Sequence, residues 1–172
     1  MRVDEAAIHE FLHTAYPRLV AAVALVSGNR PAAEDAVQEG LLRAWQRSER
    51  GEDIESLPSW VAAAAFNLAR SGVRRRLAER RARSRMTTAP SADVTDASDH
   101  GIDVARALER LPRRQREAVV LRYYLQFDTK EIAEAMGVHD GTVKSTLARA
   151  RATLAVELDI DRNEEANDRG AR

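Results

Sequence analysis

The sequence predicts an all-α protein of two small helical domains, an N-terminal helical bundle and a C-terminal helix-turn-helix domain, joined by a flexible acidic linker. The helix formers Ala, Leu, Arg and Glu dominate its 172 residues, and no segment has the alternation typical of a strand. The linker, residues 84–101, is rich in Ser, Thr, Asp, Ala and Pro and cannot bury a core. We therefore expect domains at residues 1–83 and 102–158, followed by a frayed polar tail at 159–172.

Local signals predict the N-terminal helices in order. Apolar residues at helical spacing indicate a first helix over Val3–His13. Pro17 suits the first turn of a second helix, and Gly28 can end it. Pro31 opens a third helix, whose apolar side is expected to hold Ala36, Val37, Leu41, Leu42, Ala44 and Trp45. After a break at 51–58, a long helix is expected to begin near residue 59 and to end near residue 83.

Charge is segregated along the chain although 27 Lys and Arg balance 27 Asp and Glu. Residues 66–85 contain eight arginines against one glutamate, whereas residues 86–104 contain four aspartates and no cation. Such segregation points to an electrostatic role, because a helix this basic repels itself unless an anion such as phosphate screens it. A solvated run of charge is the alternative.

Several classes of function are excluded by composition. The chain has no cysteine, so disulfides, thiolate nucleophiles and cysteine metal sites are ruled out. It has no apolar run of membrane length and no signal-peptide core near its start, so we expect a cytoplasmic protein without membrane contact.

The stretch DTKEIAEAMGVHDGTVKSTLARARATL predicts a helix-turn-helix. Asp128 can cap the first helix, with Glu131 completing a capping box. Gly137 supplies the positive φ of the turn, and Val138 fills the space between the helices. The residues expected to face inward are Ile132, Ala133, Met136, Val143, Leu147, Ala150 and Leu154.

The outer face of the second helix has side chains that suit a DNA major groove. Lys and Arg can bind phosphate or guanine, and Ser and Thr form adaptable hydrogen bonds. These residues are Thr142, Lys144, Ser145, Thr146, Arg149 and Arg151. An ordinary helical hairpin with a solvated basic face is the alternative.

Three stretches together resemble bacterial RNA polymerase sigma factors of the extracytoplasmic-function group, in the sigma-70 family, and the resemblance spans about residues 8–158. AEDAVQEGLLRAW (33–45) resembles the helix that grips the clamp of core polymerase, and WVAAAAFNLARSGVRRR (60–76) the helix that melts and reads the −10 element. LPRRQREAVVLRYYLQFDTKEIAEAMGVHDGTVKSTLARARATL (111–154) resembles the domain that reads the −35 element.

The resemblance implies a role for each of three residue sets. Core polymerase would be bound by Glu34, Asp35, Gln38, Glu39, Leu42 and Arg43. The −10 element would be bound by Trp60, Asn67, Arg70, Arg74 and Arg75, with the loop 46–58 capturing a flipped base. The −35 element would be bound by Arg113, Arg116, Thr142, Lys144, Ser145, Thr146 and Arg149.

The implied function is to direct core polymerase to promoters and to help open the −10 region. The implied partners are core polymerase, through its clamp and flap, promoter DNA and an anti-sigma protein. No catalysis by the chain, no cofactor, no metal and no small-molecule substrate is expected.

Departures from the family pattern leave promoter choice open. His139 precedes the recognition helix where Ser or Thr is frequent, and Thr146 stands where Arg is frequent. In the −10 helix, Phe66 and Ser71 replace an arginine and a commonly acidic residue. Gly72 follows, and we expect a kink or a close packing neighbour there; Gly40 similarly interrupts the clamp helix.

Two other functions compete with this interpretation. HEFLH (9–13) fits the zinc-protease pattern H-E-x-x-H, but His100 and His139 are the only other histidines available as a third ligand. A free-standing helix-turn-helix regulator would need a ligand-binding or phospho-acceptor domain upstream, whereas residues 1–83 are predicted to be helical throughout.

Overall fold

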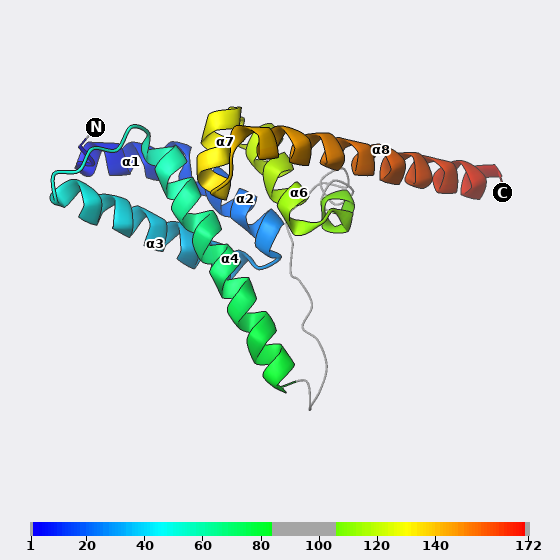
Figure 1. The fold of residues 1–172 in the computed structure, drawn as a ribbon, viewed down its shortest axis with the longest axis horizontal. Helices are drawn as coiled ribbons and strands as arrows, with labels where there is room; N and C mark the ends of the chain where they lie inside the picture. The colour runs from blue at the N-terminus through cyan, green and yellow to red at the C-terminus, as the bar shows by residue number, and fades with distance from the viewer. Residues whose placement is uncertain (1, 84–105, 171–172) are drawn as a thin grey trace.

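The computed structural model describes residues 2–83 and 106–170, with side chains described for 2–72 and 106–156, and all regular structure in these ranges is helical. The N-terminal part holds α1 (Glu5–Thr14), α2 (Tyr16–Ser27), α3 (Arg30–Glu49) and α4 (Leu57–Arg83). The C-terminal part begins with helical residues 106–110. It continues through α6 (Arg113–Val119), a π-helical turn η1 (Val120–Tyr124), α7 (Thr129–Met136) and α8 (Asp140–Gly170) (Figure 1).

Helix ends lie close to where the sequence predicts them because local hydrogen bonds and glycine conformation define them. The Asp4 carboxylate accepts a hydrogen bond from the backbone N–H of Ala7 at 2.9 Å and so caps α1. Gly28 ends α2 with φ 66°, and the Asn29 side chain caps α3 by accepting from Ala32 N–H at 2.7 Å. The expected first, second and third helices are confirmed.

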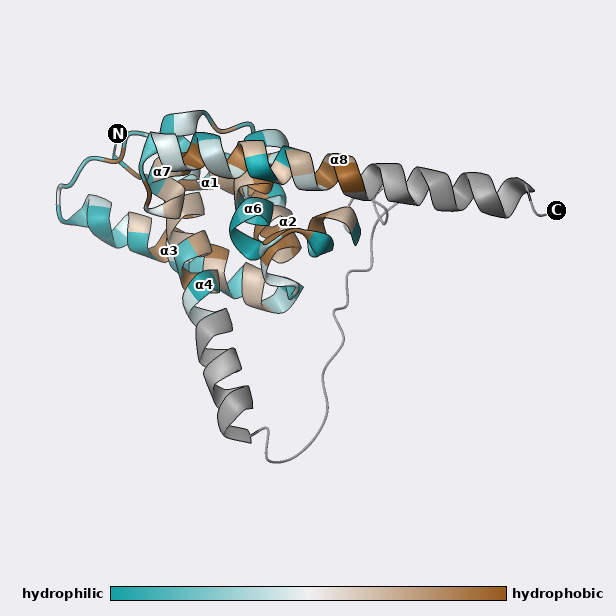
Figure 2. Ribbon diagram, turned by 45° about the vertical axis from the view of Figure 1, so that its right-hand side comes forward, coloured by the Kyte–Doolittle hydropathy of each residue, from teal (hydrophilic) through white to brown (hydrophobic). Residues whose placement is uncertain are grey.

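The N-terminal helices pack around a core of fully buried side chains that includes Leu19, Val37, Val61 and Phe66. The hydrophobic sequence of α2 lies within this bundle (Figure 2). Phe66, one of the departures from the family pattern, is therefore a core residue. A Cβ atom built on Gly40 would lie 3.1 Å from the Val61 carbonyl oxygen, so glycine there lets α3 and α4 approach closely.

Leu42 and Trp45, on the predicted apolar side of α3, are 51% and 40% exposed and so offer apolar contact surface. Two local expectations are wrong. Helix α4 is continuous across Gly72, and no atom lies within 4 Å of a Cβ built there, so the expected close neighbour is absent. The backbone of residues 159–170 continues α8 as a helix, where we expected a frayed tail.

The C-terminal helices form the predicted helix-turn-helix around Leu121, Ile132 and Val143, all fully buried. Gly137 adopts φ 64° at the turn between α7 and α8, and Val138 packs against the core. Gln126, in the connection between η1 and α7, has a backbone φ of 63°, a value that residues other than glycine rarely adopt. The inward face predicted for the motif is confirmed, with Leu154 only partly buried.

The two parts pack against each other, and the predicted linker, 84–101, lies outside the described residues. Helix α7 lies against α4, and η1 and α6 lie against α2 (Figure 1). Buried residues of both parts form one continuous hydrophobic cluster. Within the described ranges, no helix combines the length and apolarity that crossing a membrane requires.

Candidate functional site

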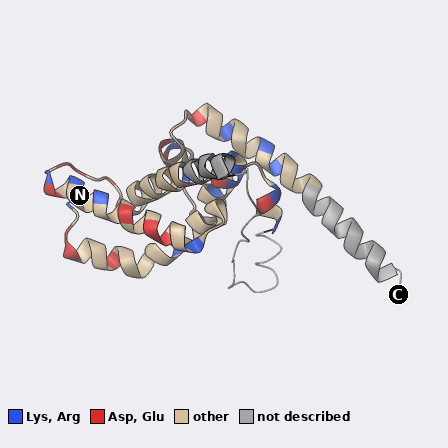
Figure 3. Cartoon of the chain, turned by 90° about the horizontal axis from the view of Figure 1, so that it is seen from below, with Lys and Arg blue, Asp and Glu red and all other residues tan. Residues whose placement is uncertain are grey.

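The first candidate surface is the outer face of α8. Lys144 and Arg149 are exposed, as are Thr142 and Arg151, while Ser145 and Thr146 are half-buried. The Ser145 hydroxyl donates to the Thr142 carbonyl oxygen at 3.0 Å, so its donor is already used within the helix. Figure 3 shows the Lys and Arg positions of α8 following one acidic position at its start. The structure thus brings the predicted recognition residues onto one open basic face.

A capping box begins α7, the helix that precedes α8 in the helix-turn-helix. The Asp128 side chain accepts from the N–H of Glu131 at 2.8 Å, and the Glu131 side chain accepts from the N–H of Asp128 at 2.9 Å. These reciprocal bonds satisfy two backbone donors at the helix start. The predicted capping box is confirmed, and it fixes the residue at which α7 begins.

Arg113 and Arg116, which we expected at phosphate, are both half-buried in α6. The Arg116 guanidinium donates to the carbonyl oxygens of Glu109 and Leu111, at 2.7 and 3.4 Å. Burial lowers the pKa of Arg116, and the nearby Glu109 carboxylate opposes this shift. Arg116 therefore holds the segment before α6 in place. These hydrogen bonds give Arg116 a structural role in addition to the predicted contact with phosphate.

The second candidate surface lies on α4. Trp60 is half-buried and Asn67 is exposed. The Arg70 guanidinium hydrogen-bonds the Asn67 side chain and also donates to the Ala135 carbonyl oxygen of α7 at 3.0 Å. It forms an ion pair at 2.5 Å with Glu117 of α6. The side chains predicted to follow along the helix, Arg74 and Arg75, lie outside the described residues.

The segment expected to form a base-capturing loop, 46–58, is more ordered than predicted. Its first four residues continue α3, and Leu57 already opens α4. Ion pairs join Glu52 to Arg47 at 2.9 Å and to Arg50 at 3.4 Å. Ile54 is only 1% exposed and anchors the loop in the core. The rest of the loop is held in place in two ways. Glu52 pairs with the two arginines at the end of α3, and the side chain of Ile54 is buried.

The third candidate surface is the polar face of α3. Asp35, Gln38, Leu42 and Arg43 are exposed, while Glu34 and Glu39 are half-buried. Surface ion pairs of i,i+4 spacing join Arg30 to Glu34 and Arg43 to Glu39, at 3.3 and 2.7 Å. The six predicted polymerase-binding residues thus share one side of the helix, accessible to a large partner.

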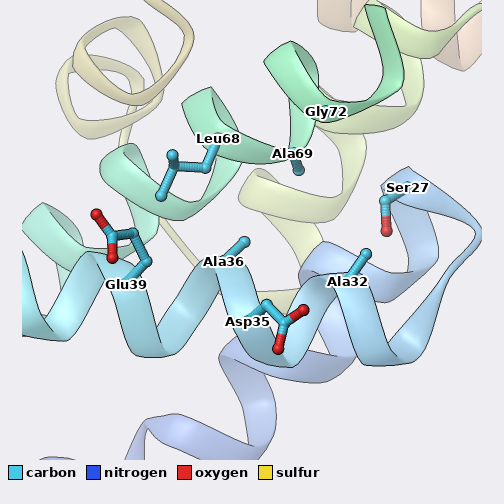
Figure 4. A pocket seen from close by; sticks show the side chains of 8 residues that line it. All are labelled: Ser27, Ala32, Asp35, Ala36, Glu39, Leu68, Ala69 and Gly72. Carbon is cyan, nitrogen blue, oxygen red and sulfur yellow. The ribbon is translucent and has the colours of Figure 1, made fainter. Parts of the chain in front are cut away.

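Two hollows border this face. One, of about 330 Å³, is apolar and is lined by Ile8, Leu12, Tyr16, Gln38, Leu41, Leu42 and Trp45. The sequence did not single out the α1 residues because only the folded chain sets them beside α3. The other, of about 280 Å³, lies between α3 and α4, with Asp35 and Glu39 on one wall and Leu68, Ala69 and Gly72 on the other (Figure 4).

The zinc-protease pattern does not form a metal centre in the described part of the chain. The Nε2 atoms of His9 and His13 lie 3.2 Å apart on the exposed face of α1. Within the described ranges, no group of three or more potential ligands could hold a metal ion. A catalytic zinc site needs at least three protein ligands, so this part of the chain does not support the hydrolase alternative.

Comparisons with known proteins agree with the geometry. The family model described as Sigma-70 region 2 matches residues 12–79, and that for Sigma-70, region 4 matches residues 102–154. The ECF RNA polymerase sigma factor EcfG of Rhodopseudomonas palustris is 36% identical over 86% of this chain and 82% of its own. The RNA polymerase sigma-E factor of Streptomyces coelicolor is 34% identical over 73% of this chain and 71% of its own.

Solved structures have the same fold. The sigma factor RpoE of Bartonella quintana, solved in complex with the anti-sigma factor NepR, matches with a TM-score of 0.74 and 28% identity, over 92% of this chain and 99% of that one. CnrH, solved with the cytosolic domain of CnrY, matches with a TM-score of 0.65 at 21% identity, over 92% and 91% of the two chains.

Proposed function

The chain belongs to the extracytoplasmic-function group of RNA polymerase sigma factors, in the sigma-70 family, and from this premise we propose how its residues divide the work of promoter recognition. As a sigma factor it directs core RNA polymerase to promoters and helps to open the −10 region. We assign polymerase and −10 binding to residues 1–83, −35 binding to residues 102–158, and the connection to residues 84–101. The match of a different sigma region to each helical part carries this assignment.

The outer face of α8 is the proposed −35 reader. Its exposed cations can approach phosphate and base edges, and the capping box and the Gly137 turn fix its angle in the groove. Lys144 and Arg149 are the proposed principal contacts, flanked by Thr142, Ser145 and Thr146. Arg116 and Arg113 would support the same strand from α6, with Arg116 also holding the preceding segment.

The exposed side of α4 is the proposed −10 reader. Asn67 and Arg70 offer hydrogen-bond donors for a displaced single strand, and Trp60 offers a ring for stacking. Arg74 and Arg75 extend the predicted set along the same helix. Binding energy from these contacts would offset base unstacking, which costs a few kcal/mol per step.

The polar face of α3 is the proposed site for the polymerase clamp, and the C-terminal part is proposed to meet the flap. Glu34, Asp35, Gln38, Glu39 and Arg43 supply charge complementarity, and Leu42 supplies exposed apolar area. Because RpoE was solved with an anti-sigma factor, we also propose an anti-sigma partner for this chain. We infer that the protein acts in the cytoplasm and that polymerase, not this chain, performs the chemistry of RNA synthesis.

Transcription with purified components tests the proposal. The protein is mixed with sigma-free core polymerase and fragmented genomic DNA, and transcript start sites are mapped. We expect specific starts that need both protein and core. Lys144→Ala with Arg149→Ala should abolish them, while Arg2→Ala, an exposed cation outside the three surfaces, should not. A protein that binds DNA alone and confers no initiation on core would instead be a free-standing regulator.

A further inference from the structure

One pair of side chains has no part in the three candidate surfaces. His9 and His13 stand one turn apart on α1, and both are exposed. Their Nε2 atoms lie 3.2 Å from each other, while their ring centroids are 4.4 Å apart and the ring planes are inclined at 55°. Because the nitrogens are closer together than the ring centres, the two imidazoles turn their Nε2 atoms toward a common point on the surface of the helix.

The separation of the two nitrogens suits two ligands of one metal ion. In a tetrahedral zinc site, with Zn–N bonds of about 2.0–2.1 Å, two ligand nitrogens are about 3.3 Å apart. A hydrogen bond between the two Nε2 atoms fits the same distance, and a metal ion can replace its proton with little movement of either ring. The spacing of four residues is also the one by which two histidines of helical zinc motifs share an ion.

The helix holds both histidines in place without help from a ligand. The Asp4 carboxylate caps its first turn, and the Ala15 N–H closes its last turn on the Phe11 carbonyl oxygen at 2.9 Å. Phe11 itself is 2% exposed and anchors the other face of α1 in the core. An ion that binds here therefore does not have to order the chain first, which favours binding.

We propose that His9 and His13 together bind a divalent transition-metal ion of the zinc class through their Nε2 atoms. Imidazole nitrogen suits Zn²⁺, Cu²⁺ and Ni²⁺, whereas Mg²⁺ and Ca²⁺ prefer oxygen ligands. Two protein ligands are fewer than the three of a catalytic zinc site, so water fills the other positions and the ion exchanges with solution. The site is a surface chelate rather than a hydrolase centre, and the inference does not rest on the proposed function.

The surroundings of the pair define what a bound ion changes. Leu12 precedes His13, is 43% exposed, and lines the apolar hollow that α1 shares with α3. A dication on the pair is therefore placed next to a residue of that hollow, with its water-filled positions open to solvent. The ion also joins two successive turns of α1, so it stabilises this helix locally.

Zinc binding by the full, untagged chain tests the proposal. The chain has no cysteine, so thiolate, the other common zinc ligand, does not compete. Zn²⁺ is titrated in competition with a fluorescent zinc indicator, and we expect one ion per chain. His13→Ala should weaken binding at least about tenfold because it removes one of the two ligands. Equal affinities of the native protein and this variant would overturn the proposal.

Two matched variants separate the pair from histidine content alone. His13→Ala with Thr14→His keeps the number of histidines but moves the second ring off the shared face, because residues five apart are not neighbours on a helix. It should bind zinc as weakly as His13→Ala. His100→Ala with His139→Ala removes every other histidine and should bind like the native protein. Native affinity in the first variant, or weakened binding in the second, would overturn the assignment to this pair.

The position of the ion is read from the protein itself. In long-range ¹H–¹⁵N spectra, zinc should shift the Nε2 resonances of both His9 and His13 and leave those of His139 unchanged. A shift confined to one ring would overturn the chelate. Zinc should also slow hydrogen exchange of the α1 amides in the native protein but not in His13→Ala. Helical circular dichroism verifies that the variants, all changed at exposed positions within the described ranges, remain folded.

Discussion

Gly40 and Gly72 both lie within helices, but only Gly40 has close neighbours where a side chain would be. Substitution by alanine should therefore change stability in opposite directions at the two positions. At Gly40 an added Cβ would meet the Val61 carbonyl oxygen at 3.1 Å and its side chain at 3.2 Å, both in the packed core. At Gly72 an added Cβ meets nothing within 4 Å. We expect Gly40→Ala to lower the free energy of unfolding by about 1–3 kcal/mol through overpacking. Gly72→Ala should raise it by about 0.5–1 kcal/mol through helix propensity.

Urea unfolding followed by circular dichroism measures both changes, and each variant is the control for the other. Loss of stability in Gly72→Ala would mean that the hollow beside it, lined by Leu68 and Ala69, closes in solution. A neutral Gly40→Ala would mean that α3 and α4 can separate by a few tenths of an ångström at no cost.

The buried Glu117 should make stability fall as the pH rises through its titration. Burial raises the pKa of this carboxyl above its ordinary value of 4.5, and Arg70, Arg113 and Arg114 oppose the shift without reversing it. A raised folded-state pKa means that the folded protein holds the proton more tightly than the unfolded chain. The contribution of Glu117 is then complete below pH 4.5 and is lost as the pH rises through the raised value.

The non-titrating variant Glu117→Gln isolates this contribution. Its free energy of unfolding is measured beside that of the native protein at a series of pH values upward from 4.5. We expect the native protein to lose stability relative to the variant as the pH rises. A relative gain would show instead that the ion pair with Arg70 outweighs burial and lowers the pKa.

At the scale of the element, α7 has only eight residues, and its cap should account for much of its stability. Asp128→Ala removes one half of the capping box and should cost about 0.5–2 kcal/mol. Asp128→Asn keeps a good capping residue and should cost much less, so it is the matched control. Hydrogen exchange of the α7 amides measures the effect locally. Equal protection in the two variants would mean that packing on α4 alone holds the helix.

The elements that the sequence predicted well are those with strong local signals. Pro17 and Gly28 mark the two ends of α2, Pro31 marks the start of α3, and Asp128 and Gly137 mark the ends of α7, because caps and turns depend on nearby residues. The π-helical turn η1 and the left-handed Gln126 carried no such signal. The turn η1 packs against α2, α6 and α7, and periodicity along the chain does not report such contacts.

The sequence predicted the candidate surfaces that consist of exposed residues on one helix. It did not predict the contacts between the N-terminal and C-terminal parts of the chain. The face of α8 and the polar side of α3 follow from helical spacing alone, and the structure places their residues accordingly. Arg70 pairs with Glu117, 47 residues later, and no local sequence pattern around either residue predicts this pair. Helical spacing put Leu42 and Trp45 on the apolar side of α3 but did not decide between core and contact, because an apolar residue at core spacing can equally serve an exposed contact surface.

At the scale of the whole molecule, the packing of the C-terminal part on the N-terminal part predicts when the protein can work. A promoter presents its −10 and −35 elements apart, whereas α7 covers the proposed −10 surface of α4 while the halves are joined. Glu55 and Lys130 line one hollow between the two parts, and the chain has no native cysteine, so the double variant Glu55→Cys, Lys130→Cys can be linked by a short bismaleimide with a reducible spacer. The linked protein should give no promoter-specific transcript with core polymerase, and reduction of the spacer should restore it. The uncross-linked double variant, treated with the same reductant, is the control for damage by the substitutions. Full activity of the linked protein would mean that opening of this contact is not required for initiation, and that the strand reaches Arg70 by another path.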